Sequence, residues 1–304
     1  MRSWLLLFAC NLMWALQFTC VKLVQDQVGA LFTVWGPMTL ATILLLPLIW
    51  REKRETHHEG ERYPRDWLAF FLLALLGIFP GQVLITWGTR MSLASNAALL
   101  MLTLPITTAV LAFIFLRERM TGVRWISFAL AMLGVLMCSN LQFGSMNFGK
   151  SYLAGNTLIF VGTLGSAFYN SYSKKVLERY SPLEVLFYTY LGMLILLTPL
   201  VMKEEASVFG HLSSLTARTW IGLALLTFFH NFLSMVLFLR ALKQLDAIQA
   251  ALSNYLITFF GVPIAAIWLG ERLTPVAVIG GLIILGSTLL ITLKETGEAE
   301  NAGH

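Results

Sequence analysis

The feature that most constrains this chain is an internal repeat. Residues 94–136 and 247–289 align without a gap at a constant offset of 153 positions. In each copy an apolar run ends in Leu-x-Glu-Arg-x-Thr, with Glu118 in the first copy and Glu271 in the second, and another apolar run follows at once. A duplication of about half the chain predicts two similar units, so the function depends on how these units face each other.

The composition predicts that the chain folds in lipid. Of the 304 residues, 57% are hydrophobic and 12% are charged, which is more apolar surface than a soluble domain can bury. A helix needs about 20 apolar residues to cross the hydrocarbon core of a bilayer. Ten runs qualify, at 4–24, 31–50, 67–88, 95–116, 122–141, 152–173, 182–202, 218–239, 247–268 and 275–293. We therefore expect an all-α membrane protein with ten transmembrane helices.

The basic residues predict the orientation in the membrane. With the N-terminus in the cytoplasm, most of the 21 Lys and Arg residues fall in cytoplasmic segments. The outer side then keeps Lys22, Arg90, Lys150, Lys203, Arg218 and Arg272. Because cytoplasmic loops carry the excess of Lys and Arg, we expect an inner-membrane protein whose N- and C-termini both lie in the cytoplasm. The first run lacks a small-x-small cleavage pattern, so we expect it to remain as a helix.

The repeat then predicts two inverted bundles. The first would cover 4–140, the second 152–293, and a cytoplasmic tail 294–304 would follow. Each unit contains five of the ten predicted spans. Because five is odd, the second unit enters the membrane in the opposite sense to the first. Two such bundles can expose one shared site to either side of the membrane in turn, which is the geometry of alternating access.

Local signals mark helix ends and a bend. Ser181-Pro182-Leu183-Glu184 predicts a capping box that opens the seventh span, and Asp246 with Gln249 predicts a similar start for the ninth. Thr121 and Thr274 would cap the fifth and tenth spans. Gly77 and Gly81 flank Pro80 inside the third span, which indicates a bend or a locally unwound turn that gating could use.

The motifs resemble a known family. The pattern Trp14-Ala15-Leu16-Gln17-Phe18 followed by Lys22 is similar to the opening of EamA-type permeases of the drug/metabolite transporter superfamily. Leu269-Gly270-Glu271-Arg272-Leu273-Thr274 with Gly280-Gly281 is similar too. The resemblance covers nearly the whole chain and implies ten spans and export of amino acids or other small metabolites. The first copy departs from the family pattern by having Arg117 where Gly usually precedes the Glu.

Polar side chains inside the spans are the candidate substrate site, because such residues are costly in lipid. They are Gln17, Gln82, Tyr169, Asn170, His230, Asn231, Asn254 and Tyr255. The competing interpretation is ordinary hydrogen bonding between helices. Trp14 and Tyr255 would form aromatic walls, and Phe18 is a further aromatic candidate. Lys22 would hold an anionic group of the substrate, or would extend to the membrane interface.

Two further groups could couple transport to protons. His230 titrates near neutral pH when free, but a packed neutral imidazole is the simpler interpretation. Glu118 and Glu271 could carry protons, but their positions beside Arg119 and Arg272 at helix ends favour a structural role in which each braces its hairpin. An intramembrane enzyme would need a carboxylate dyad, a Ser–base pair or a metal set on facing spans, and none is evident.

Other functions are excluded on physical grounds. Gly144–Ser151 matches the phosphate-loop pattern, but it joins two membrane helices and lacks the strand–loop–helix context. The basic residues form no patch for nucleic acid. Cys10, Cys20 and Cys138 lie in apolar runs without metal spacing, so we expect neither a metal nor a cofactor.

We therefore expect a secondary transporter without ATP, as a monomer or homodimer, that exports small metabolites, most of all amino-acid-like compounds. The alternative is a drug or quaternary-amine exporter. No Asp or Glu lies in the middle of any span, which disfavours proton exchange on a buried carboxylate. An aromatic cage could still hold a quaternary amine.

Overall fold

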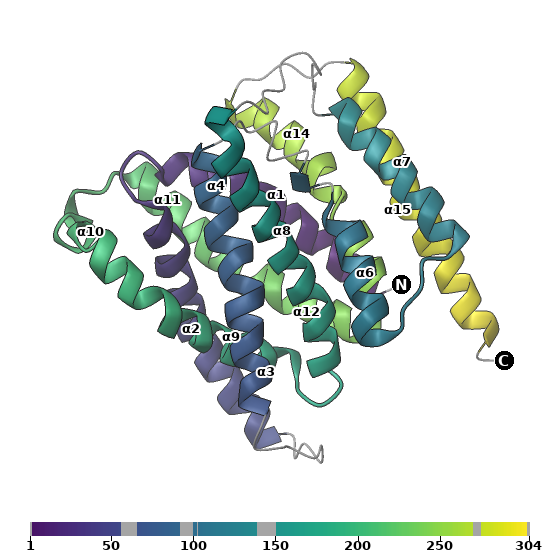
Figure 1. Ribbon diagram of the computed structural model, residues 1–304, viewed down its shortest axis with the longest axis horizontal. Coiled ribbons are helices and arrows are strands. Elements are labelled where there is room, and N and C mark those ends of the chain that lie inside the picture. The colour runs from purple at the N-terminus through teal and green to yellow at the C-terminus, as the bar shows by residue number, and fades with distance from the viewer. Residues whose placement is uncertain are drawn as a thin grey trace.

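The chain forms a helical bundle in a computed structural model that describes residues 2–55, 66–91, 100–101, 103–138, 150–269 and 275–302 (Figure 1). No strand occurs within these ranges. In chain order the elements are α1 (Arg2–Val24), α2 (Ala30–Glu55), α3 (Asp66–Leu72), the π-helix η1 (Leu73–Leu84), α4 (Ile85–Met91), α6 (Leu104–Leu116), α7 (Gly122–Cys138), α8 (Lys150–Val176), α9 (Pro182–Glu204), α10 (Ser207–Gly210), the 3₁₀ turn η3 (Leu212–Ser214), α11 (Ala217–Leu225), the π-helix η4 (Leu226–Leu233), α12 (Ser234–Gln244), α13 (Ala247–Ser253), α14 (Leu256–Leu269) and α15 (Pro275–Ala302).

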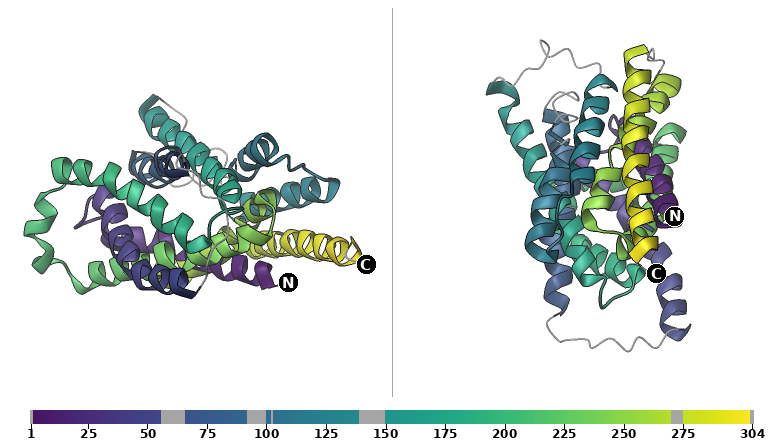
Figure 2. Two further views of the ribbon diagram at one scale, coloured as in Figure 1. Left: turned by 90° about the horizontal axis from the view of Figure 1, so that it is seen from below. Right: turned by 90° about the vertical axis from the view of Figure 1, so that its right-hand side faces the viewer.

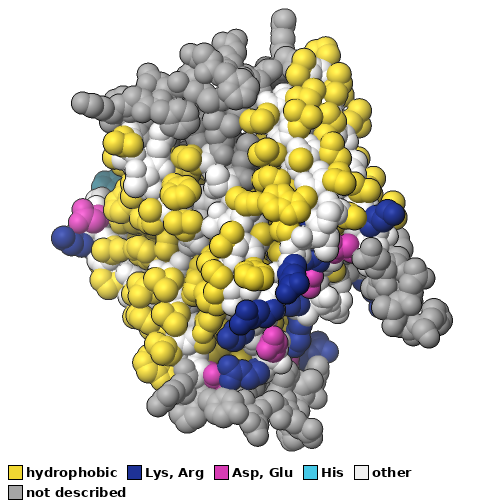
Figure 3. Space-filling model, turned by 45° about the vertical axis from the view of Figure 1, so that its right-hand side comes forward, with side chains coloured by type: hydrophobic (Ala, Val, Ile, Leu, Met, Phe, Trp, Pro, Cys, Tyr) yellow, Lys and Arg dark blue, Asp and Glu magenta, His cyan; other side chains and the backbone are white. Residues whose placement is uncertain are grey.

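Several of these helices suit a bilayer. Within the described part of the chain, six helical stretches are long and apolar enough to cross a membrane, namely Arg2–Val21, Ala30–Glu52, Asp66–Gly88, Pro182–Glu204, Ala217–Gln244 and Val278–Glu295. Leu104–Leu116 and Gly122–Met137 are shorter apolar helices. Figure 3 shows a largely hydrophobic surface over one face, with most charged side chains gathered toward one end. This pattern is typical of a multi-pass membrane protein.

Helices α7 and α15 form an antiparallel pair at one edge of the bundle (Figures 1 and 2). The Ser127 hydroxyl donates to the carbonyl oxygen of Ser287 at 3.1 Å. Further along, a methyl group added to Gly134 would lie 2.6 Å from the carbonyl oxygen of Gly280. From the first contact to the second, the residue numbers increase along α7 and decrease along α15, so the two helices run in opposite directions. The small residues allow the backbones to approach closely, as helix pairs in lipid require.

The third predicted span is one continuous helix whose middle, η1, is π-helical. The sequence analysis expects a bend or an unwound turn at Gly77, Pro80 and Gly81, and no unwound turn occurs between Asp66 and Met91. A wider π turn gives the Pro80 ring room inside the helix. The glycines serve close packing, because a methyl group added to Gly81 would lie 2.6 Å from the Ser166 hydroxyl on α8.

A second π-helix, η4, begins at Leu226, which is the repeat counterpart of Leu73 at the start of η1. Side chains bind the backbone carbonyls of this segment. The Asn231 amide donates to the carbonyl oxygen of Leu226 at 2.9 Å, and the Tyr190 hydroxyl of α9 donates to that of Asn231 at 2.7 Å. Because buried carbonyls need partners in lipid, these bonds stabilise the irregular helix.

The ninth predicted span, 247–268, is broken. Helix α13 ends at Ser253 and α14 begins at Leu256. Across the break the Asn254 and Ile257 amides donate to carbonyls three residues back, at 3.1 and 3.0 Å. In the fourth predicted span, Thr103 is a turn residue before α6, and its amide also bonds three residues back, to Leu100 at 3.1 Å. Thr103 is the repeat counterpart of Leu256, the first residue of α14, so the two irregularities lie close to each other in the repeat alignment.

Carboxylates tie the two parts of the chain together. Glu118, in the turn after α6, accepts the amides of Ala247 and Ile248 at 2.9 and 3.0 Å and thereby caps α13. Glu205, after α9, accepts the amides of Leu31 and Phe32 at 3.0 and 2.8 Å and caps α2. A negative charge at a helix N-terminus satisfies free amides and complements the helix dipole.

Around Glu118 lies a cluster that we term the charged end, made of Glu118, Arg124, Lys174, Asp246 and Glu295. The buried Arg124 guanidinium forms ion pairs with Asp246 at 2.5 Å and Glu295 at 2.7 Å. The Lys174 ammonium donates to the carbonyls of Leu242 and Leu245, both at 2.8 Å, at the end of α12. Burial raises the pKa of Glu118, against the lowering effect of its two backbone hydrogen bonds.

The predicted helix caps form where the structure describes them. The Ser181 hydroxyl accepts the Glu184 amide at 3.1 Å, and the Glu184 carboxylate accepts the Ser181 amide at 3.2 Å. The Thr121 hydroxyl accepts the Arg124 amide at 3.3 Å. Thr274 lies outside the described residues. Arg117 ends α6 with φ of 63°, a left-handed conformation that favours glycine and that explains the Gly expected at this position.

Candidate functional site

A central cavity of about 130 Å³ lies between elements from both parts of the chain. Its lining residues are Trp14, Gln17, Gly77, Ile78, Gly81, Gln82, Ile85, Met101, Leu104, Ser166, Tyr169, Asn170, His230, Met235, Phe238, Asn254 and Ile257. The volume is close to that of an engineered cavity of about 150 Å³ that admits benzene. A small metabolite of similar size therefore fits without rearrangement of the helices.

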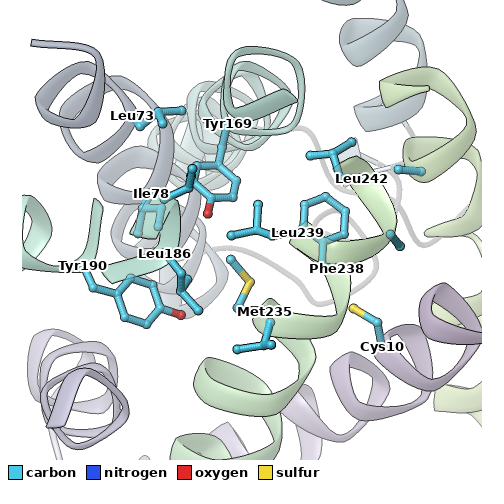
Figure 4. Packing of buried hydrophobic residues seen from close by; sticks show 14 of the residues in the cluster. Cys10, Leu73, Ile78, Tyr169, Leu186, Tyr190, Met235, Phe238, Leu239 and Leu242 are labelled. Carbon is cyan, nitrogen blue, oxygen red and sulfur yellow. The ribbon is translucent and has the colours of Figure 1, made fainter. Parts of the chain in front are cut away.

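One face of α8 supplies the polar wall of the cavity. Ser166, Tyr169 and Asn170 are spaced so that they lie on the same side of the helix. Tyr169 and Asn170 are buried, with 5% and 6% of their surface exposed. Figure 4 shows Tyr169 from α8 and Phe238 from α12 approaching the interior from different sides. The cavity therefore combines a hydroxyl and an amide with an aromatic surface.

Helices α1 and η1 supply further parts of the wall, and η1 packs directly against α8. Trp14 and Gln17 lie almost one turn apart on α1, and the Trp14 ring packs against Phe238 with centroids 5.1 Å apart. On η1 and the start of α4, Ile78, Gln82 and Ile85 recur at helical spacing and face the cavity. An amide beside aliphatic surface is typical of sites for amphipathic ligands.

Two residues reach the cavity from irregular backbone. His230 belongs to the π-helix η4, and Asn254 lies in the break between α13 and α14. His230 is the repeat counterpart of Gly77, and Asn254 is the counterpart of Met101, so matching positions in the repeat line the same cavity. Irregular helices of membrane proteins are tolerated where they face a cavity, and π-helical segments are frequent at functional sites.

The cavity gathers unpaired polar atoms. Among the described residues, six buried side-chain polar atoms lack a hydrogen-bond partner: Asn11 Oδ1, Trp14 Nε1, Thr108 Oγ1, Tyr169 OH, His230 Nδ1 and Asn254 Oδ1. Four of these belong to cavity-lining residues. An unpaired buried polar group costs about 1–3 kcal/mol, so four of them around one cavity indicate a site where a ligand or water supplies the missing partners.

A second, much smaller cavity of about 10 Å³ adjoins the first. It shares Gln17, Gln82 and His230 with the main cavity, and Asn231 lies on its wall. This volume is close to the minimum that one water molecule occupies. Asn231 thus lies behind the main cavity and not on its wall.

Four other predicted site residues remain: two lie away from the lining of the main cavity, and two have side chains that the structure does not describe. Tyr255 is buried and its ring lies 6.3 Å from that of Phe128. Pro80 faces α8, where a methyl group added to Gly165 would lie 2.7 Å from its Cβ. The side chains of Phe18 and Lys22 lie outside the described part of the structure.

The bracing residues have different environments. Glu118 caps α13 as described above, a contact that favours bracing. Arg119 has an exposed side chain, and its carbonyl oxygen accepts from Arg124 at 3.0 Å. Glu271 and Arg272 lie outside the described residues. The sequence analysis placed Glu118 as a brace of its own hairpin, whereas the carboxylate reaches a helix of the other repeat.

The lining also contains residues that the sequence analysis did not select: Ile78, Ile85, Met101, Leu104, Ser166, Met235, Phe238 and Ile257. Most are apolar, and apolar side chains in a membrane span carry no signal that separates a cavity wall from a lipid-facing surface. Ser166 was predictable, because it precedes Tyr169 and Asn170 by three and four residues on one helix face. Helical spacing around a selected polar residue is therefore the useful signal.

Comparison with known proteins agrees with this architecture. A model of the EamA-like transporter family matches residues 1–140 and 153–293. A protein of Streptantibioticus cattleyicolor described as a "probable terminal-alkyne amino-acid exporter" is 27% identical over 95% of this chain and 93% of its own length. A protein of Archaeoglobus fulgidus described as an "uncharacterized transporter" is 25% identical over 96% of this chain and 99% of its own.

A solved crystal structure has a similar fold. It superposes with a TM-score of 0.78, covers 96% of both chains and shares 13% sequence identity. At this level of identity the likeness concerns the fold alone. The chain thus shares its helical architecture with a protein of very different sequence.

Proposed function

This chain belongs to the EamA-like transporter family, and from that premise we propose that it moves a small amphipathic metabolite across the membrane through the central cavity. The observation that carries the proposal is the set of unpaired polar atoms on Trp14, Tyr169, His230 and Asn254. A ligand that supplied their hydrogen bonds would recover free energy that the empty cavity lacks. The solute would cross without chemical change.

The transport cycle would be alternating access between two inverted five-helix repeats, 4–140 and 152–293, with ten spans in all. The antiparallel contact of α7 with α15 supports this arrangement, because these are the last helices of the two repeats. Ser127 and Gly280 are repeat counterparts, and so are Gly134 and Ser287. Ser127 contacts Ser287 and Gly134 contacts Gly280, so the two contacts are equivalent under the repeat. Such an equivalence is what a two-fold axis in the membrane plane produces.

Gating would use the irregular helix segments. Residues of η1, which contains Gly77, Pro80 and Gly81, line the cavity, and so do His230 of η4 and Asn254 at the break. Broken and π-helical segments deform at lower cost than regular helices, since their hydrogen bonds already depart from the regular pattern. The bracing contacts of Glu118 with α13 would have to open when α13 moves.

The solute would be an amino-acid-like compound, moved outward from the cytoplasm. The relative from Streptantibioticus cattleyicolor, described as an exporter of a terminal-alkyne amino acid, supports this class. The distribution of basic residues supports an inner-membrane location with both termini in the cytoplasm. The cavity contains both hydrogen-bonding and apolar side chains, as an amino acid with an apolar side chain requires.

Counterflow into sealed proteoliposomes tests the proposal. Vesicles loaded with one unlabelled neutral amino acid should accumulate the labelled compound, and Asn254→Ala should reduce the rate at least tenfold. The matched control is Asn156→Ala, a buried asparagine of α8 outside the cavity lining, which should retain transport. Absence of counterflow for every amino acid and amine tried would contradict the proposed function.

A quaternary amine is the second candidate for the solute. Three aromatic residues, Trp14, Tyr169 and Phe238, line the cavity, and an aromatic face attracts a cation. The same counterflow assay with labelled choline would identify this activity. Accumulation of choline without accumulation of any amino acid would replace the first proposal with this one.

A further inference from the structure

The part of the cavity lining that the structure describes is polar without formal charge. None of the lining residues that the structure describes is Asp, Glu, Lys or Arg. Hydrogen bonding comes from neutral side chains, namely those of Trp14, Gln17, Gln82, Ser166, Tyr169, Asn170, His230 and Asn254. A ligand with a net charge in such a site would lose its hydration without gaining a counter-charge, which is strongly unfavourable in a membrane interior.

Among the residues whose side chains the structure describes, Arg124, Lys174 and Glu118 of the charged end are paired with other groups of the protein. Arg124 is paired with Asp246 and Glu295. Lys174 is directed to the carbonyls at the end of α12, and Glu118 to the amides of α13. These side chains therefore stabilise the charged end and are not available to balance a charge in the cavity.

We infer that the cavity selects solutes of zero net charge that join a zwitterionic head to an apolar chain, as neutral amino acids do, and that it rejects their cationic and anionic analogues. The inference rests on the proposed transport function and specifies its substrate class. In a zwitterion the ammonium group balances the charge of the carboxylate. Neutral hydrogen-bonding groups of the protein are therefore sufficient to bind both.

The unpaired atoms include donors and an acceptor that suit such a head. Trp14 Nε1–H and the Tyr169 hydroxyl can donate to a carboxylate, and Asn254 Oδ1 can accept from an ammonium group. Hydrogen bonds to charged groups are about twice as strong as those between neutral groups, so a zwitterion gains more from these atoms than an uncharged alcohol or amide.

The remainder of the lining suits an unbranched or branched aliphatic chain. Ile78, Ile85 and Ile257 provide aliphatic surface, and Met101 and Met235 add flexible thioethers. Methionine adapts its shape to different apolar ligands. We therefore expect tolerance toward the length of the apolar chain together with strict discrimination against charge.

Pairs of amino acids that differ by one charge test the inference on the wild-type full-length protein. Binding of norleucine is compared with lysine, and glutamine with glutamate, by calorimetry in nanodiscs at pH 8, where the side chains of lysine and glutamate are charged. We expect the neutral member of each pair to bind at least tenfold more tightly. Equal or tighter binding of lysine or glutamate overturns the inference.

The counterflow assay separates the two levels of the proposal. If lysine, glutamate or choline is transported as fast as norleucine, the substrate class is wrong and the transport function stands. If no solute of either kind moves, the proposed function and the substrate class are overturned together. Transport of norleucine and glutamine without transport of lysine, glutamate or choline supports both.

A charge placed in the lining provides a second test. Asn254→Asp introduces a carboxylate where an ammonium group is expected, so the preference for norleucine over lysine should fall at least tenfold. Asn156→Asp introduces the same group into α8 outside the lining and should leave the preference unchanged. An unchanged preference in a folded Asn254→Asp protein would overturn the assignment of Asn254 as the ammonium acceptor.

Discussion

The charged end and the central cavity differ in whether their buried polar atoms have partners within the protein. At the charged end Arg124 bonds to two carboxylates, Lys174 to backbone carbonyls and Glu118 to two amides. In the cavity, Trp14, Tyr169, His230 and Asn254 each keep a buried atom without a partner. The first region is complete within the protein, whereas the second leaves hydrogen bonds for another molecule to supply.

This difference indicates which region stabilises the fold and which one binds a ligand. Satisfied polar networks rigidify a structure, and unsatisfied ones are costly unless a ligand completes them. Removal of a side chain from the charged end should therefore reduce stability. Removal of an unpaired atom from the cavity should reduce ligand affinity without reducing the stability of the empty protein.

The largest effect is expected for Arg124→Ala. The substitution leaves Glu295, which is 11% exposed, and Asp246, which is 44% exposed, without their shared cation. Breaking a buried pair costs about 3–5 kcal/mol, and the exposure of Asp246 places the loss near the lower figure, about 3 kcal/mol. Denaturant unfolding in detergent measures it. The matched control Arg240→Ala removes an exposed arginine of α12 and should have little effect.

Two tyrosines sharpen the contrast. Tyr169→Phe deletes an unpaired hydroxyl in the cavity and should reduce amino-acid affinity about tenfold, or about 1.4 kcal/mol, without a loss of stability. Tyr190→Phe deletes a hydroxyl bonded to the Asn231 carbonyl and should reduce stability by about 1 kcal/mol. Calorimetry and unfolding of both variants provide the measurements. A loss of stability in Tyr169→Phe would show that its hydroxyl is paired.

A smaller gain is expected from Arg117→Gly. Arg117 has a left-handed φ of 63°, which costs a residue with a side chain about 1–2 kcal/mol and costs glycine little. Glycine also gains freedom in the unfolded chain, so the net increase in stability should be about 1 kcal/mol. The same substitution at Arg119, which has no positive φ, should not stabilise. An equal response at both positions would exclude the backbone explanation.

The smallest effect concerns pH at the charged end. Burial raises the pKa of Glu118, so the folded state holds this proton more tightly than the unfolded chain does. The contribution of Glu118 to stability is therefore greatest below the usual glutamate pKa of about 4.3, and it decreases as the pH rises through the raised pKa. Thermal unfolding from pH 4 to 7 should show a steeper decline for wild type than for Glu118→Gln. Parallel curves would contradict the assignment.

The sequence predicted the helical class and the cavity residues to a useful degree. Nine of the predicted residues line the cavity: Trp14, Gln17, Gly77, Gly81, Gln82, Tyr169, Asn170, His230 and Asn254. The polar residues were found because a polar side chain inside a span needs a hydrogen-bond partner. The glycines were found because they flank a proline inside a span, which indicates an irregular helix. The apolar lining carried no such signal, so Ile78, Met235 and Phe238 emerged only from the structure.

The sequence by itself determined that this is a helical membrane protein with an internal repeat, because both follow from the order and spacing of apolar residues. The tertiary structure decided that Glu118 reaches the amides of α13 and not its own hairpin, that Pro80 is accommodated in a π-helix, and that the ninth span breaks at Asn254. These outcomes depend on which groups, distant in sequence, come close enough to exchange hydrogen bonds. Short-range patterns do not contain that information.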